Sequence, residues 1–202
     1  MDSIIPLIDN TILLLSSAEK AYEKVQNDNQ LKVSFHSAGE GLVDVISALQ
    51  SIKPLIGSAN SGGDIEAAET SVRECQKKAK LSKRLFVHIA EAPPNKRLHG
   101  YMTYLALQDD DQMAEILVRG MMANVCDLAK QAGVAETIKS SLKKLAWAIE
   151  ELDEEISKQK TNEKAGTVHH SGVGDLYSAK DAATQINNTG TGNQYNGTDK
   201  SH

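Results

Sequence analysis

The stretch LKVSFHSAGEGLVDVISALQSI, residues 31–52, decides the fold of this chain. Its apolar side chains recur at alternating intervals of four and three residues, which places them on one side of an α-helix. They are Leu31, Phe35, Ala38, Leu42, Val45, Leu49 and Ile52. Because a helix can bury such a stripe only against other elements, this stretch predicts a packed domain of several helices.

Four further segments show a helical period. The opening segment, residues 4–25, carries Ile8, Ile12, Leu15, Ala18, Tyr22 and Val25. The next carries Ile65, Ala68, Val72, Cys75, Ala79, Phe86 and Ile89, with the polar Ser82 among them. A less regular segment has Met113, Ile116, Leu117, Gly120, Met121, Val125 and Leu128, and the last has Ile138, Leu142, Leu145, Ile149, Leu152 and Ile156. The sequence therefore predicts an all-α fold, an antiparallel bundle of about five long helices joined by short loops.

Turn-forming residues separate these segments. The first break is residues 26–29, the second is the Gly/Ser-rich stretch 57–63, and the third is residues 92–95 with two prolines. Proline ends a helix because it lacks the backbone donor and clashes with the preceding turn. Asp64 is expected to cap the N-terminus of the helix that follows, since its carboxylate can accept the free N–H groups of the first turn.

The middle of the chain is less clearly divided. Residues 96–107 form a short helix or an ordered connection, and the sequence leaves these alternatives open. Asp109, Asp110 and Asp111 favour a helix N-terminus through capping and the helix dipole. Gly133 is expected to close that helix.

Composition bounds the function. The 202 residues are 40% hydrophobic and 24% charged, with a net charge of −5, as in an ordinary globular protein. This balance argues against nucleic acid as a partner, which would need a concentrated Lys/Arg surface that we do not find in the sequence. Cys75 and Cys126 are expected to be buried free thiols of a reducing compartment. The N-terminus lacks the basic start of a signal peptide, so we expect a cytoplasmic protein.

The candidates for chemistry are weak. The pair His169–His170 has no nearby Cys or carboxylate cluster to complete a metal site. His36 is expected on a helix surface, and the acidic run 150–155 on the solvated side of the last helix. The glycines of residues 190–197 lack the Lys and the strand–loop–helix setting of a phosphate loop. We therefore predict no catalytic residue, no metal site and no cofactor, and hence no enzyme.

The last 40 or so residues, 161–202, differ in character and are expected to be disordered, because they carry too few apolar groups to offset the entropy of ordering. Within about 185–198 lies an uncharged, Pro-free segment rich in Asn and Gln, whose halves mirror each other around Gly-Thr-Gly. Stacked in register, such side chains form amide ladders, so this segment is either amyloid-prone or an inert linker. Its residues are Gln185, Ile186, Asn187, Asn188, Thr189, Gly190, Thr191, Gly192, Asn193, Gln194, Tyr195 and Asn196.

The helical part resembles a known family. The stretches 21–25, 31–36 and 41–49, together with Met113–Leu117 and Met121–Ala129, resemble the SesA domain found at the N-terminus of fungal NACHT and other P-loop NTPase receptors. The resemblance covers about residues 1–160 and includes no catalytic signature. The tail is similar to fungal amyloid signalling motifs of the sigma and pseudo-palindromic kinds, through residues 188–196.

Together these resemblances imply a non-enzymatic effector or adaptor. A receptor carrying a matching amyloid motif would template the tail, the tail would self-assemble, and the helical domains would be brought together. Programmed cell death or non-self recognition would follow.

In the related HeLo and HeLo-like domains an N-terminal helix attacks membranes, which would place the active chain at the plasma membrane. The candidate segment here is Ile4, Ile5, Leu7, Ile8, Ile12, Leu13, Leu14 and Leu15. Its one-sided pattern also fits a first core helix, which we favour for the resting chain. The alternative function is a plain helical interaction domain with an inert tail.

Overall fold

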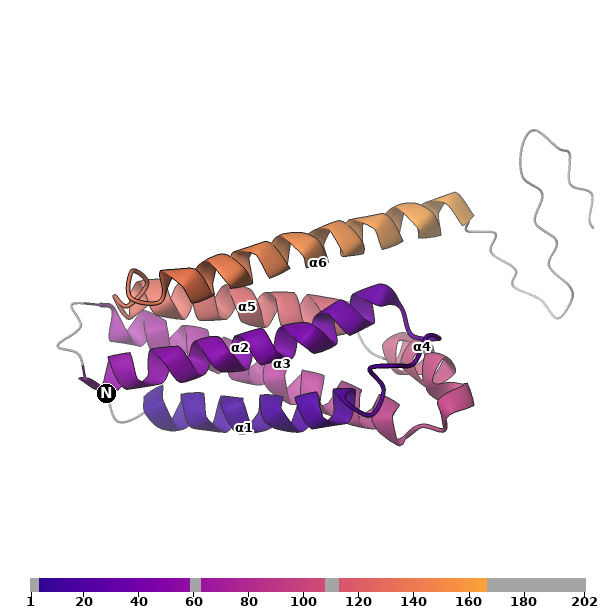
Figure 1. The fold of residues 1–202 in the computed structure, drawn as a ribbon, viewed down its shortest axis with the longest axis horizontal. Helices are drawn as coiled ribbons and strands as arrows, with labels where there is room; N and C mark the ends of the chain where they lie inside the picture. The colour runs from indigo at the N-terminus through magenta and orange to yellow at the C-terminus, as the bar shows by residue number, and fades with distance from the viewer. Residues whose placement is uncertain (1–3, 59–62, 108–112, 167–202) are drawn as a thin grey trace, which may run out of the picture. The chain divides into compact units, whose positions relative to one another are not determined.

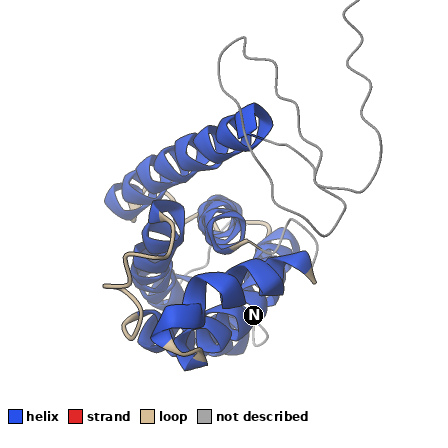
Figure 2. Cartoon of the chain, turned by 90° about the vertical axis from the view of Figure 1, so that its right-hand side faces the viewer, coloured by secondary structure: helices blue, strands red, loops and turns tan. Residues whose placement is uncertain are grey.

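The computed structural model describes residues 4–58, 63–107 and 113–166, with side chains for all of these except Ser58 and 159–166. The regular elements in these ranges are all helices (Figures 1 and 2). They are α1 (Ile4–Tyr22), α2 (Val33–Ser58), α3 (Ile65–Glu91), the 3₁₀ turn η1 (Pro94–Lys96), α4 (Arg97–Ala106), α5 (Ala114–Gln131) and α6 (Lys139–Gly166). Five of these helices are long, which confirms the predicted all-α bundle.

Helices α1, α2, α5 and α3 form a closed ring in that order, each packed against the next. Side by side in the ring, α1 and α2 run antiparallel, because Asp9 pairs with Lys53 and Ile5 lies against Gly57. The neighbours α3 and α5 are also antiparallel.

The remaining two edges of the ring are parallel. Ser34 of α2 bonds Glu115 of α5, and the start of each helix therefore lies beside the start of the other. On the other edge the Tyr22 ring at the end of α1 lies 5.9 Å from the Phe86 ring near the end of α3. Chain neighbours α2 and α3 thus sit on opposite corners of the ring, which corrects the expectation that short loops make neighbouring helices pack antiparallel against each other.

The core is apolar and centred on aromatic rings. Phe35 of α2 is fully buried, with its ring centroid 5.0 Å from that of Phe86 and 5.2 Å from that of Tyr101. Offset and edge-on ring contacts of this kind stabilise a core beyond the area they bury. The apolar stripe of residues 31–52 is buried at every position, as predicted: Leu31, Phe35, Ala38, Leu42, Val45, Leu49 and Ile52.

The helix ends follow local chemistry. Asp64 accepts a hydrogen bond of 3.0 Å from the Ala67 N–H, so the predicted N-cap of α3 is confirmed. Gly133, with φ of +72°, ends α5 in the left-handed conformation that glycine adopts without strain. Residues 97–106 are a helix, which settles the alternative left open for this stretch. The aspartates 109–111 lie outside the described residues.

Helix α2 contains Pro54 and nevertheless continues to Ser58. Proline cannot donate to the carbonyl of Gln50 four residues earlier. Both side chains are exposed, so the carbonyl on this side of the helix faces water, which can replace the lost partner.

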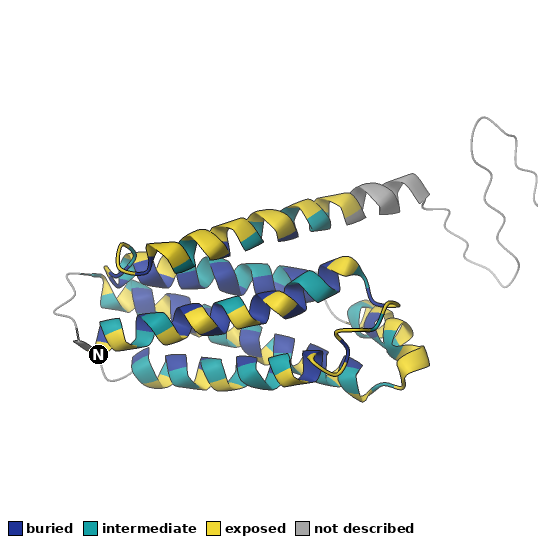
Figure 3. Cartoon of the chain, in the orientation of Figure 1, coloured by how far each residue is buried: buried dark blue, intermediate teal, exposed yellow. Residues whose placement is uncertain are grey.

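Helix α6 lies outside the ring and is held to α2 and α5 by ion pairs. Lys144 pairs with Asp44 of α2, and Arg119 of α5 pairs with Asp153, both at 2.5 Å. Figure 3 shows α6 as the most exposed of the long helices, and only Leu145 and Leu152 of its described side chains are fully buried. The acidic run lies on its solvated side, as predicted, apart from the half-buried Asp153 and Glu155.

Candidate functional site

Helix α1, the candidate membrane segment, is a core helix in this structure. Its inward residues Ile4, Ile8 and Leu15 are completely buried. Ile5, Leu7, Ile12 and Leu14 are half-buried, and only Leu13, at 70% exposure, points to solvent. The expectation that α1 belongs to the resting core is met, while its later release stays a prediction.

Tyr22 packs the C-terminal end of α1 against α2. Its ring packs directly over the backbone of Gly39 in α2, where a Cβ atom would lie 2.6 Å from Tyr22 Cγ and closer to two other ring carbons. The Tyr22 hydroxyl lies 3.4 Å from His36 Nδ1, and His36 Nε2 lies 3.0 Å from the Asp28 carbonyl. Since a carbonyl can only accept, Nε2 carries the proton of this hydrogen bond, and Tyr22 is the partner of Nδ1.

His36 therefore corrects a prediction. It is half-buried and bonded on both nitrogens, whereas the sequence suggested a surface residue. The reason is the turn after α1, which folds back over the start of α2. Burial, with a smaller contribution from Glu40, raises the pKa of Tyr22, which keeps its hydroxyl protonated as a donor.

The same turn is tied to α4. Arg97 donates to Asp28 Oδ2 at 3.1 Å, and both side chains are largely buried, at 15% and 8% exposure. Asp28 Oδ1 also accepts from the Gln30 N–H, so this carboxylate is well satisfied. A polar groove of about 510 Å³ lies beside the pair, between the turn and η1. The Arg97–Asp28 pair thus connects the turn between α1 and α2 to α4.

A second polar centre is enclosed in the core. Glu115, fully buried in the first turn of α5, accepts from Ser34 at 3.3 Å and from the Tyr101 hydroxyl at 3.1 Å. The Tyr101 oxygen in turn lies 3.4 Å from the Ala114 N–H. Burial and the Glu115 charge raise the pKa of Tyr101 strongly, so it remains a donor. No described groove opens onto this centre, which joins α2, α4 and α5 structurally.

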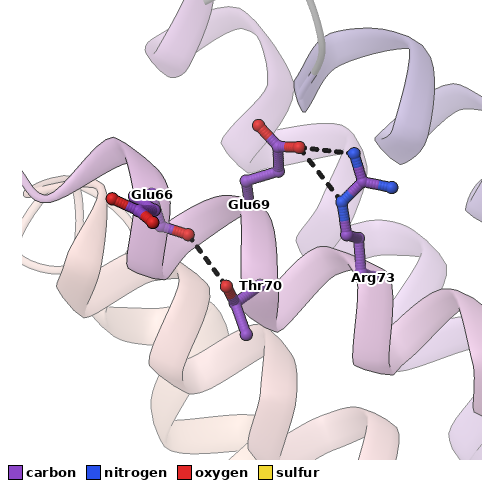
Figure 4. Close-up of polar contacts among 4 residues, drawn as sticks. All are labelled: Glu66, Glu69, Thr70 and Arg73. Carbon is purple, nitrogen blue, oxygen red and sulfur yellow. Dashed lines mark hydrogen bonds and ion pairs between the residues drawn. The ribbon is translucent and has the colours of Figure 1, made fainter.

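The surface between α1 and α3 is basic. In the first half of α3, charges are compensated: Arg73 pairs with Glu69 beside the Thr70–Glu66 hydrogen bond (Figure 4). In the second half, cationic side chains line a groove of about 330 Å³ together with two apolar side chains. The lining residues are Leu14, Lys80, Lys83, Arg84 and Val87. The prediction that the chain has no concentrated Lys/Arg surface is wrong at this edge.

Within the described residues, no group of His, Cys, Asp and Glu side chains could hold a metal ion. None of the described helices has the length and apolar character to cross a membrane. Cys75 and Cys126 are both free, as predicted, but only Cys75 is buried and Cys126 is half-exposed. Burial raises the pKa of the Cys75 thiol to about 12, so it stays protonated and unreactive at neutral pH.

Comparison with known families places this chain. Residues 8–128 match the SesA family, described as an N-terminal domain on NACHT_NTPase and P-loop NTPases. The match covers α1 to most of α5, and the chain belongs to this family. No curated protein and no solved structure matches the chain.

Sequence reasoning missed the basic groove and the buried centre. A signal for the groove was present, since Lys77, Lys78, Lys80, Lys83 and Arg84 occur with no acidic residue between Cys75 and Ala90. For Glu115 there was no signal, because a glutamate in a first helical turn is usually exposed. The predicted tail motif, residues 185–196, and His169–His170 lie outside the described residues.

Proposed function

We propose that this chain is a non-enzymatic effector or adaptor that acts with a NACHT or other P-loop NTPase receptor. The observation that carries the proposal is family membership across residues 8–128. Domains of this family are N-terminal to NTPases, and a helical bundle without a described metal cluster suits a domain that signals by contact.

The tail supplies the switch in this proposal. Residues 185–196 form an uncharged, Asn/Gln-rich segment, and such segments stack into cross-β ladders. A receptor with a matching motif would template the ladder, and copies of this chain would join it. The bundles would then be concentrated at one place, which in a fungal cell would lead to programmed cell death or non-self recognition.

Helix α1 is the segment that we propose acts on the membrane. Together with α2 it is the most apolar of the described helices, and ion-pair and hydrogen-bond contacts at Asp9 and Tyr22 hold its two halves. Once crowded, the bundle would release α1 to a membrane, taking the chain from the cytoplasm to the plasma membrane. An adaptor that keeps α1 in the core and presents the bundle to another protein is the competing function, favoured by the complete burial of Ile4, Ile8 and Leu15.

The tail is tested in the full chain with Gln194→Pro. Proline removes a ladder donor and cannot occupy a central strand, so fibres should not form. Fibre diffraction of the unsubstituted chain should show spacings near about 4.7 Å and about 10 Å. If the substituted chain forms the same fibres, the strand is misplaced; if neither chain assembles even when seeded, the tail is a linker.

The proposed release of α1 to a membrane is tested by a substitution at Leu13. This side chain is exposed in the bundle, so Leu13→Asp should leave the melting temperature unchanged while making α1 a poor membrane helix. Loss of leakage from vesicles with fibre formation retained would support release of α1. Deleting residues 1–15 would be a poorer test, because it removes the buried Ile4, Ile8 and Leu15 and with them the fold.

A further inference from the structure

The second half of α3 carries charge that no described residue neutralises. Lys77 pairs with Glu74, and Lys78 donates to Asn124 Oδ1 at 3.1 Å. The next cations along the helix make no ion pair with any described residue. These are Lys80, Lys83 and Arg84, which line the α1–α3 groove. Three neighbouring cations repel one another, so an anionic partner would be favoured at this edge.

The groove is also partly apolar. Leu14 of α1 and Val87 of α3 contribute to its lining. A partner that matches this surface needs an apolar side chain close to carboxylates. Free phosphate would satisfy only the charges and leave the two aliphatic side chains in water.

The outward face of α6 carries an apolar side chain close to carboxylates. Trp147 is 61% exposed, which is unusual for so large an apolar side chain, and it lies one turn before a group of exposed glutamates. Glu150, Glu151 and Glu154 stand three, four and seven residues after it, which is the spacing of one helix face. Glu150 and Glu151 make no ion pair with a described residue, and Glu154 has only an exposed pair with Lys158.

The two surfaces cannot meet within one molecule. The ion pairs of α6 tie it to α2 and α5, whereas the basic groove lies on the α1–α3 edge, on the other side of the ring (Figure 1). We propose that the α6 face of one copy docks into the α1–α3 groove of a second copy, with Trp147 against Leu14 and Val87 and the glutamates against Lys80, Lys83 and Arg84.

Because different surfaces meet, the contact is heterologous and does not close on itself unless a ring forms. Copies should therefore associate head to tail into short open chains, and each contact would cover the outer side of α1. This association resides in residues 14–154 and does not depend on the tail, so it can succeed or fail separately from the proposed function.

The test is sedimentation velocity of the full chain carrying Gln194→Pro, which removes tail assembly. Mass should grow with concentration at low salt, and raising salt from about 50 mM to about 500 mM should weaken association at least about tenfold, because these charges are exposed. Two matched variants remove one surface each: Lys80→Gln with Lys83→Gln and Arg84→Gln, and Glu150→Gln with Glu151→Gln and Glu154→Gln.

Each variant alone should be monomeric, and their mixture should form a 1:1 complex that grows no further, since one intact groove meets one intact α6 face. Circular dichroism checks that both variants keep the bundle. The proposal is overturned if the unsubstituted surfaces stay monomeric at low salt, or if either variant alone still associates. Binding of the monomer to phosphatidylserine vesicles, lost only in the Lys/Arg variant, would overturn it too and assign the groove to an anionic membrane.

Discussion

At the scale of single residues, Gly39 shows how closely the backbones of α1 and α2 approach. A methyl group at this position would overlap the Tyr22 ring, which is itself packed against Phe86. We expect Gly39→Ala to destabilise the domain by about 1–3 kcal/mol, the usual cost of overpacking a core. Urea unfolding followed by circular dichroism measures the loss.

Gly100 in α4 provides the matched control for Gly39. A Cβ atom there meets nothing closer than 3.8 Å, so the better helix propensity of alanine should dominate. Gly100→Ala should be neutral or stabilising. Equal losses for the two substitutions would mean that the contact between Tyr22 and Gly39 does not limit the packing.

The buried Glu115 makes a separate prediction for Tyr101. Tyr101→Phe removes one of the two donors to this carboxylate and should cost about 1–3 kcal/mol, because a buried acceptor is left unsatisfied. Tyr104→Phe in the same helix is the control, since its hydroxyl makes no hydrogen bond with a described residue. If both changes are equally mild, Glu115 does not depend on Tyr101.

The pH dependence of Tyr101 has a definite sign. Its pKa in the folded chain is raised above 10.0, so the folded state holds this proton more tightly than the unfolded state. The stabilisation is complete below pH 10.0 and falls as the pH rises above it. Unfolding free energies measured against pH should therefore decline less steeply above pH 10.0 for Tyr101→Phe than for the unsubstituted chain.

At the scale of elements, helix α2 allows a comparison between adjacent residues. Leu42 is fully buried, whereas Val43 is 44% exposed. Leu42→Asp should unfold the bundle, because an unpaired charge in the core costs far more than the marginal stability of a domain. Val43→Asp should keep the fold with a nearly unchanged melting temperature. The reverse ranking, seen by thermal circular dichroism, would mean that the apolar stripe faces outward.

Features that depend on residues close in sequence could be predicted, whereas features that depend on tertiary packing could not. The stripe of α2 and the cap at Asp64 rest on neighbours within a turn or two, so periodicity and capping rules were sufficient. Pro54 inside α2 and Glu115 in the core depend on which side of a helix faces water after packing. The same holds for the α1–α3 groove. Its cationic side chains can be counted in the sequence, but that they line a groove follows only from the packing of α1 beside α3.

Release of α1 would be costly without a trigger. Burial of Ile4, Ile8 and Leu15 alone contributes about 1.5–3 kcal/mol for each side chain, so the released form is rare in the resting chain. A trigger must supply a comparable free energy through contacts that only the released form makes. In the proposed function that trigger would be cross-β assembly of many copies, followed by membrane insertion of α1.

At the scale of the whole molecule, the ring of α1, α2, α3 and α5 should be more stable than its attachment to α6. The described part of α6 buries only Leu145 and Leu152 fully, and its ion pairs to the ring are partly exposed, worth at most about 1 kcal/mol each. Helix α3, in contrast, buries side chains along its whole length, from Ala68 to Ile89.

Native-state hydrogen exchange followed by mass spectrometry should therefore separate the two parts. Amides of residues 139–158 should exchange at least about 100-fold faster than the core amides of α3, which corresponds to about 3 kcal/mol of local opening. Leu152→Ala should speed exchange in α6 and leave that of α3 almost unchanged. If α6 and α3 instead exchange together, only by global unfolding, then α6 is an integral part of the core and cannot move independently of the ring that holds α1.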